Sequence, residues 1–150
     1  MRAVTMIAQS TTPAPTLGDR RSHTSVGYVP GVCNIGSAEI ARRRRSGHVA
    51  LVVTAVLFLV LVGIGAPPIV RLLVAAPAAV AAACYLEVRY RFCAGLGSLG
   101  LFNFGELGRH DVVVDPADRA RDRAMALRIG VGAALIGVAV GIVAAALLPL

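Results

Sequence analysis

Three cysteines are the residues of this chain whose chemistry could extend beyond packing. Cys33, Cys84 and Cys93 stand at wide spacings, which fits neither a disulfide framework nor a paired zinc motif. Cys84 lies among alanines and is expected to be an inert apolar residue. Cys33 precedes four consecutive arginines and Cys93 follows Arg89 and Arg91, and nearby cations lower the pKa of a thiol. What the thiols can do depends on the elements that position them.

The composition indicates a membrane protein rather than a soluble domain. Apolar residues make up 57% of the 150 residues and charged residues 15%, against roughly 45–50% and about 25% in soluble domains. The apolar excess is concentrated in residues 49–86 and 129–148, as in membrane spans. The net charge of +7 comes from arginines that flank these segments, without the aromatic-interleaved basic face typical of a nucleic-acid-binding protein. We therefore expect no nucleic-acid partner.

The first two apolar segments predict a tight transmembrane hairpin. Val49–Ala66 is uncharged and, at about 27 Å, long enough for a hydrocarbon core. The Pro67–Pro68 pair then turns the chain. Ile69–Leu86 is the second span, in which Arg71 is expected to extend to the headgroups near the turn and Pro77 to kink the helix. The alternative for this weaker segment is a re-entrant or interfacial hairpin.

The third span is predicted at Ile129–Leu148, and one of its faces is lined with small residues. Such a stripe lets two helix backbones approach closely. The stripe either packs against the first two helices of the same chain or joins two copies in a homodimer. Its members are Ala133, Gly137, Gly141 and Ala145.

The placement of arginines predicts the orientation in the membrane. Arginines collect in cytoplasmic segments close to membrane spans. The turn side of the hairpin has only Arg71, so the positive-inside rule predicts a cytoplasmic N-terminus and a C-terminus outside. The arginines expected to act as topology anchors are Arg42, Arg43, Arg44 and Arg45 before the first span, and Arg89 and Arg91 after the second. Arg109, Arg119, Arg121, Arg123 and Arg128 complete that side.

A basic surface helix is predicted within residues 31–47. Asn34 or Ser37 would cap its N-terminus, with Glu39 in the first turn facing the positive end of the helix dipole. The helix would run along the inner surface and enter the membrane near His48, an interfacial residue.

Residues 89–115 are predicted to form a loop without regular helix, because the segment contains several glycines, which disfavour a helix. No lysine and no strand–loop–helix frame accompany these glycines, which argues against a phosphate-binding loop. The aromatic residues predict an interfacial belt. The aromatic residues are Tyr90, Phe92, Phe102 and Phe104, and the glycines are Gly95, Gly97, Gly100 and Gly105.

Residues 116–150 are predicted to begin with a charged, solvated lead-in to the third span. Asp115 is suited to cap this helix, with proline at the first helical position. Asp115 and Arg119 are spaced for an i,i+4 ion pair, and Asp118 and Arg121 for an i,i+3 pair.

The predicted topology brings Cys33 and Cys93 to the cytoplasmic face, beside an arginine-rich membrane surface. Two such thiols could carry a persulfide, exchange disulfides or bind a soft metal. The alternative is that both cysteines simply lie in loops.

A family resemblance favours the thiol hypothesis. The residues "CNIG" at 33–36, the basic segment 42–47, the tight hairpin and "FC" ending at Cys93 resemble the YgaP-like transmembrane domain family over about residues 32–100. These are small bacterial inner-membrane hairpins, sometimes fused to a rhodanese sulfurtransferase domain. The resemblance implies a sulfur or thiol link and not an enzyme. The chain departs from the pattern because no proline follows Cys93, no rhodanese domain is present and a third span is added.

The sequence thus predicts an all-α integral membrane protein, with a tight transmembrane helical hairpin at residues 48–88, a third transmembrane helix and a disordered segment at residues 1–30. We expect a multi-pass protein of a bacterial inner membrane, without enzymatic activity, cofactor or metal. Its partners would be the lipid bilayer and a second copy or another protein. The function would be structural or partner-binding, and the alternative is a thiol-dependent accessory in sulfur or redox handling. A small transporter is disfavoured because the spans hold no acidic residue.

Overall fold

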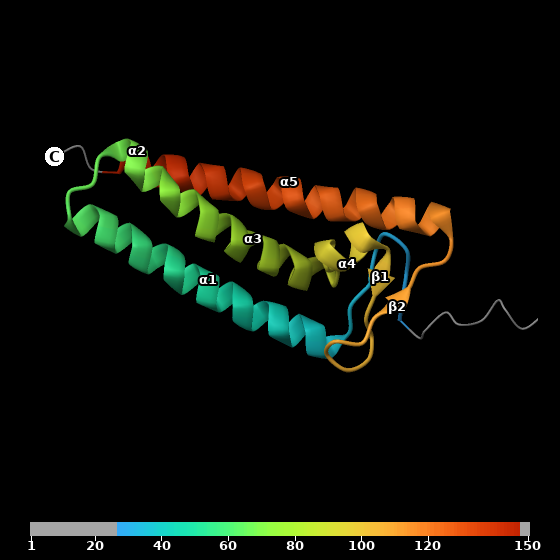
Figure 1. Ribbon diagram of the computed structural model, residues 1–150. Coiled ribbons are helices and arrows are strands. Elements are labelled where there is room, and N and C mark those ends of the chain that lie inside the picture. The colour runs from blue at the N-terminus through green and yellow to red at the C-terminus, as the bar shows by residue number, and fades with distance from the viewer. Residues whose placement is uncertain (1–26, 148–150) are drawn as a thin grey trace, which may run out of the picture.

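The computed structural model describes residues 27–147, and its architecture is three long helical segments lying side by side (Figure 1). The first is α1 (Ser37–Gly63) and the last is α5 (Pro116–Ala146). The middle segment is composite and consists of α2 (Pro68–Arg71), the 3-10 helix η2 (Leu72–Val74) and α3 (Ala75–Tyr90). Each of the three is long and apolar enough to cross a membrane. Most of the predicted disordered segment lies outside the described residues, but Val29 forms a backbone bridge with Cys33.

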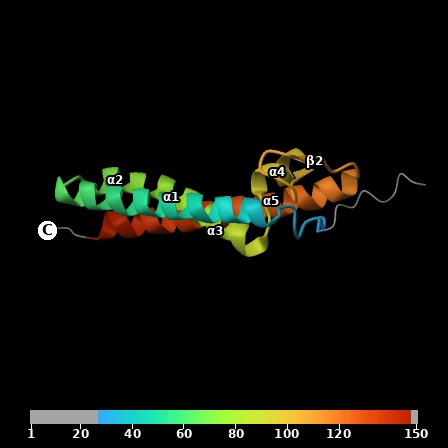
Figure 2. The same ribbon diagram turned by 90° about the horizontal axis from the view of Figure 1, so that it is seen from below.

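Small elements gather at one end of the long helices (Figure 2). They are α4 (Ala94–Leu99), β1 (Leu101–Phe102) and β2 (Asp111–Val112). The two strands pair antiparallel, with Leu101 opposite Val112. The all-α prediction therefore omitted a two-residue ribbon, which is too short to leave an alternating pattern in the sequence.

Helix α1 is continuous from the arginine run into the apolar segment. Its N-cap is Gly36 in an extended conformation, without a side-chain hydrogen bond. The prediction that Asn34 or Ser37 caps the helix is wrong, because the Asn34 side chain is bonded to Cys93 instead. Thr54 in the apolar part satisfies its hydroxyl by donating to the Ala50 carbonyl of its own helix, as expected for a hydroxyl without water.

The turn after α1 relies on Gly65, whose φ of +66° lies in the left-handed region that favours glycine. The regular α pattern is then interrupted at Leu72–Val74, about one turn before Pro77. Proline has no N–H, so the carbonyl of Leu73 cannot receive the usual helical bond from position 77. The irregularity predicted at Pro77 therefore appears in the preceding turn.

Arg71 is buried at the turn end of the bundle. Its Nε donates to the Ala66 carbonyl and its Nη1 to the Leu147 carbonyl, both at 2.8 Å. The expectation that Arg71 extends to the headgroups is wrong, because the last carbonyls of a helix lack intrahelical donors and a guanidinium can satisfy them. The side chain thus ties the hairpin turn to the end of α5.

The interior of the bundle is built from small residues, while large apolar residues face outward. Ala78, Ala81 and Ala133 are at most 6% exposed, whereas Val49 and Leu135 are 64% and 66% exposed. This arrangement is typical of membrane helices, where packing of small residues replaces the hydrophobic effect. The described part of the chain is therefore a candidate multi-pass membrane protein.

The small-residue stripe of α5 packs against the middle segment. A Cβ added at Gly137 would lie 2.7 Å from the Ala75 carbonyl oxygen and 3.0 Å from the Ala79 Cα. At Gly141 the added Cβ would lie 2.8 Å from the Ala75 Cβ. Ala133 is also buried, and Ala145 is half-buried. The stripe therefore serves packing within the chain, and a homodimer through the same residues stays a prediction.

The glycine-rich loop contains a helix, α4, where none was expected. Cys93 caps it by accepting a hydrogen bond from the Leu96 N–H, and Gly100 ends it with a φ of +69°. Gly97 allows close packing, because a Cβ there would come within 2.5 Å of the Phe92 ring. The glycines thus permit tight contacts rather than preventing a helix.

The predicted interfacial aromatic belt is wrong for two of its four members. Phe92 is fully buried and Phe102 is 6% exposed, while Tyr90 is 46% exposed. Phe92 packs with Ala126 and Ile129 of α5. These rings are buried by tertiary packing, because the small elements form a core of their own against the start of α5.

The predictions for the start of α5 are confirmed in part. Asp115 caps the helix by accepting from the Ala117 N–H at 2.8 Å, and Asp118 pairs with Arg121 at 2.9 Å. The pair expected between Asp115 and Arg119 is wrong, because the Arg119 Nε donates to the Val113 carbonyl.

The lead-in to the third span is not solvated throughout, because Asp122 is 0% exposed. Its carboxylate accepts hydrogen bonds from the Tyr28 hydroxyl at 2.8 Å and the Gly31 N–H at 2.7 Å. Burial and this hydrogen bond raise the pKa of Tyr28 above its ordinary value. Tyr28 also stacks on Phe102, so the segment before α1 is fixed to both α5 and the ribbon.

Candidate functional site: a buried polar cluster around Cys93

The candidate site lies at the end of the bundle where the small elements gather (Figure 1). The segment before α1 and the segment between α3 and α5 meet there. The Asn34 N–H donates to the Arg91 carbonyl at 3.2 Å, and the Asn103 N–H donates to the Asn34 carbonyl at 2.8 Å. The residues around Cys33 and those around Cys93 are therefore neighbours in space, although about 60 residues separate them in sequence.

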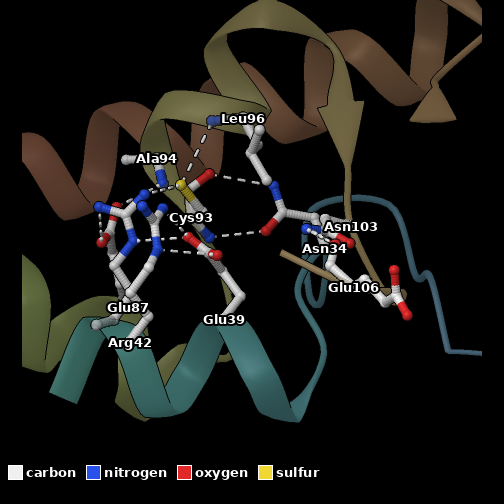
Figure 3. Close-up of polar contacts among 10 residues, drawn as sticks. Asn34, Glu39, Arg42, Glu87, Cys93, Ala94, Leu96, Asn103 and Glu106 are labelled. Atoms are coloured by element: carbon white, nitrogen blue, oxygen red, sulfur yellow. Dashed lines mark hydrogen bonds and ion pairs between the residues drawn. The ribbon is translucent and has the colours of Figure 1, made fainter. Parts of the chain in front are cut away.

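Asn34 links the two segments through its side chain (Figure 3). Its Nδ2 donates to the Cys93 carbonyl at 3.1 Å, and its Oδ1 accepts from the Cys93 N–H at 2.7 Å. An amide is the side chain that can donate and accept in this way. Asn34 is fully buried, so these bonds are shielded from water.

Arg43 is the centre of the charged part of the cluster. Its Nη1 lies 3.1 Å from the Glu87 carboxylate, its Nε lies 3.2 Å from the Glu39 carboxylate, and its Nη2 donates to the Cys93 sulfur at 2.9 Å. These contacts join α1, α3 and the residue that caps α4. One guanidinium thus connects three elements.

The two carboxylates are buried, and each is both ion-paired and hydrogen-bonded. Glu39 is 4% and Glu87 5% exposed. Glu39 also accepts from Arg42, and Glu87 accepts from the Ala94 N–H at 2.9 Å at the start of α4. Burying a carboxylate is costly unless it is paired and hydrogen-bonded, and both conditions are met here.

Burial is the main influence on the pKa of the Cys93 thiol. The residue is 1% exposed, and this desolvation raises the pKa of the Cys93 thiol above its ordinary value, while Arg43 and the Leu96 N–H act in the opposite direction. The expectation that neighbouring arginines activate this thiol is therefore wrong. A protonated, covered thiol is a poor nucleophile at neutral pH.

Cys33 differs from Cys93 in being half-buried. It lies beside a cavity that is also lined by Arg89 and Arg91, and its thiol points at the Ile35 carbonyl at 3.9 Å. Cys84 is buried, and its Cβ packs close to Gly47. The three thiols are free within the described residues, and no group of three metal-ligating side chains occurs there.

The predicted topology anchors divide into two groups. Arg42 and Arg43 pair with the buried Glu39, Arg42 from an exposed position, whereas Arg44, Arg45, Arg89 and Arg91 are exposed and have no ion pair among the described residues. His48, expected at the interface, is exposed and lies 2.6 Å from the Tyr85 hydroxyl through its Nδ1.

Sequence reasoning did not predict the partners of this cluster. Glu87 and Asp122 were not expected to be buried, and Asn34 was expected to cap a helix. One signal was available: Glu87 directly follows the second apolar segment, where an acidic residue needs a partner.

Comparison with known proteins adds no relative. No protein-family model, curated protein or solved structure matches the chain. The resemblance to the YgaP-like family therefore stays a prediction.

Proposed function

We propose that this chain is a multi-pass protein of a bacterial inner membrane, with its N-terminus in the cytoplasm, its C-terminus outside and a structural or partner-binding role. The observation that carries the proposal is the apolar exterior of the three helices, which is bordered at one end by exposed arginines. Val49, Leu59 and Leu135 are each more than 60% exposed. Only lipid or another apolar surface makes such an exterior stable.

The charge distribution supports the proposed orientation. Arg44, Arg45, Arg89 and Arg91 are exposed at the end that carries the small elements, while Arg71 at the other end is buried and bonded to carbonyls. Exposed arginines beside span ends favour the cytoplasmic side.

A non-enzymatic role is supported by the state of the buried polar groups. Arg43, Glu39 and Glu87 satisfy one another and the start of α4, which favours a structural lock between helices. Catalytic groups, in contrast, face a cleft that substrate can enter.

Topology is tested in cells with cysteines introduced at exposed positions, while the native Cys84 and Cys93 stay buried. Ser98→Cys reports the small-element end and Ile64→Cys the turn end, both in a Cys33→Ser background, since Ser98 and Ile64 are exposed. A membrane-impermeant maleimide should label Ile64→Cys in intact cells and Ser98→Cys only after lysis. The reverse pattern would overturn the orientation, and release of the chain by alkaline carbonate would overturn membrane insertion.

The proposed homodimer through α5 has its own test. Crosslinking in membranes should capture a dimer whose fraction falls in Gly137→Leu. An unchanged dimer fraction in that variant would exclude the stripe as the dimer contact. Because Gly137 packs on Ala75 and Ala79, the folded state of the variant is checked by the protection of Cys84 from alkylation.

The second candidate is a thiol-dependent accessory in sulfur or redox handling that uses Cys33 and Cys93. It is favoured by the half-buried Cys33, whose segment is hydrogen-bonded to Cys93, and the reactive thiol would be that of Cys33 because Cys93 is covered. Disulfide-linked adducts of the wild-type chain should appear on non-reducing gels and disappear in Cys33→Ser. Identical adduct patterns in both would exclude this function for Cys33.

A further inference from the structure

A cavity of about 610 Å³ opens at the arginine-rich end, separate from the Cys93 cluster. Its lining combines three parts of the chain: Gly31 and Cys33 before α1, Arg89–Arg91 at the end of α3, and Met125 of α5. Pockets of this size hold small molecules or headgroups. The lining includes two arginines together with apolar residues.

Arg89 and Arg91 line this cavity and, like Arg44 and Arg45 among the described residues, have no ion-pair partner. Arg42 and Arg43 pair with carboxylates, and Arg121 pairs with Asp118. Among the described residues, Arg89 and Arg91 form no ion pair and no side-chain hydrogen bond. The cavity therefore carries two positive charges that the described part of the chain does not neutralise.

Arg91 also has an unusual backbone conformation. Its φ of +51° makes it the only non-glycine residue with positive φ in the described range. The position ends α3, where glycine is the usual residue. Glycine would adopt this conformation with less strain, so Arg91→Gly removes the side chain without a backbone cost.

We propose that this cavity binds the phosphate group of an anionic phospholipid. Arg89 and Arg91 would contact the phosphate, while Tyr90 and Met125 would contact the glycerol and the start of the acyl chains. Arg89–Arg91 of the cavity directly follow the second apolar segment, and basic pockets between transmembrane helices on the cytoplasmic side bind anionic headgroups. The inference rests on the proposed membrane location.

Cys33 supplies a direct readout, because it lines the same cavity while the other two cysteines are buried. The full chain is reconstituted in vesicles of phosphatidylcholine, with or without phosphatidylglycerol. The rate of Cys33 alkylation by an uncharged maleimide is then followed by peptide mass spectrometry. A bound headgroup should slow this alkylation several-fold in the wild type.

Three variants separate the site from general attraction to an anionic surface. Arg89→Gln should remove most of the several-fold protection, because it removes one of the two arginines that line the cavity. Arg91→Gly should weaken it similarly while keeping or improving the fold, because glycine relieves the left-handed backbone. Arg44→Gln removes an exposed arginine that does not line the cavity, and it should keep the protection of the wild type.

Two results would overturn the proposal. Equal slowing in the wild type and all three variants would reduce the effect to surface charge. Protection by soluble glycerol 3-phosphate, in vesicles without anionic lipid, equal to that by phosphatidylglycerol would assign the cavity to a soluble phosphate. Failure of the membrane proposal is recognised separately, because the chain would then be released from the vesicles by alkaline carbonate.

Discussion

Replacing Arg43 by methionine tests whether the buried cluster holds the small elements onto the bundle. Methionine keeps much of the side-chain volume and removes the charge. Glu87, whose side chain is 6% exposed, would lose its ion-pair partner, although the Ala94 N–H would still donate to it. Glu39 would keep Arg42.

The structure sets the expected size of the effect. Removing one partner of a buried ion pair costs about 3–5 kcal/mol. Because Glu39 and Glu87 keep other partners, we expect the destabilisation by Arg43→Met to be near the lower end of this range, at about 3 kcal/mol. Arg44→Met is the matched control, because Arg44 is the next residue of the same helix and is exposed. Its effect should stay within about 0.5 kcal/mol.

The assay follows alkylation of Cys84, which is 5% exposed, during titration of the detergent-solubilised protein with dodecyl sulfate. Labelling of a buried thiol reports the opening of the helices. The double variant Arg43→Met/Glu87→Gln should recover part of the loss, because it also removes the unpaired carboxylate. Equal midpoints for Arg43→Met and Arg44→Met would refute the assigned role of the cluster.

Three further predictions concern packing, thiol reactivity and the turn. Gly137→Ala should destabilise the bundle by about 1–3 kcal/mol through overpacking, whereas Gly130→Ala, which meets open space, should be neutral or stabilising; equal effects in the same titration would contradict the close helix contact. Because burial raises the pKa of Cys93, Cys33 should react with maleimide at neutral pH while Cys93 stays unmodified, its reactivity rising only at pH values above about 8.5, the ordinary thiol pKa; comparable labelling at pH 7 would contradict the burial. Arg71→Met should lower the unfolding midpoint, since it removes the donor to the Leu147 carbonyl, and an unchanged midpoint would show that this bond does not stabilise the bundle.

The long helices and their local signals were predictable from the sequence because they depend on neighbouring residues. The apolar runs, the Pro67–Pro68 turn and the Asp115 cap each follow from a few consecutive positions. The Cys93 cluster was not predictable in this way. Arg43 and Glu87 are 44 positions apart in sequence, and no local pattern specifies which buried groups will meet. The same holds for Asp122 and Tyr28, which are 94 positions apart.

Helix α4 shows why glycine content alone was misleading. Its glycines were read as helix breakers, but Gly97 allows the close approach of Phe92 and Gly100 ends the helix. A glycine required for packing and a glycine in a loop look the same in a single sequence. The distinction depends on neighbours in space, here the Phe92 ring and the Asp122 carbonyl of α5.

The small-residue interior has a consequence for how the chain tolerates mutation. In a water-soluble bundle, truncating a large core side chain is the damaging change. Here the contact between Gly137 and Ala75 leaves no room for growth, while Leu135 and Ile142 on the outside are more than half exposed. A saturation mutagenesis screen should therefore show the opposite pattern of sensitive positions from that of a water-soluble bundle. Enlarging the small residues at the helix contacts should destabilise the fold, whereas exchange among the large exposed apolar residues should have little effect.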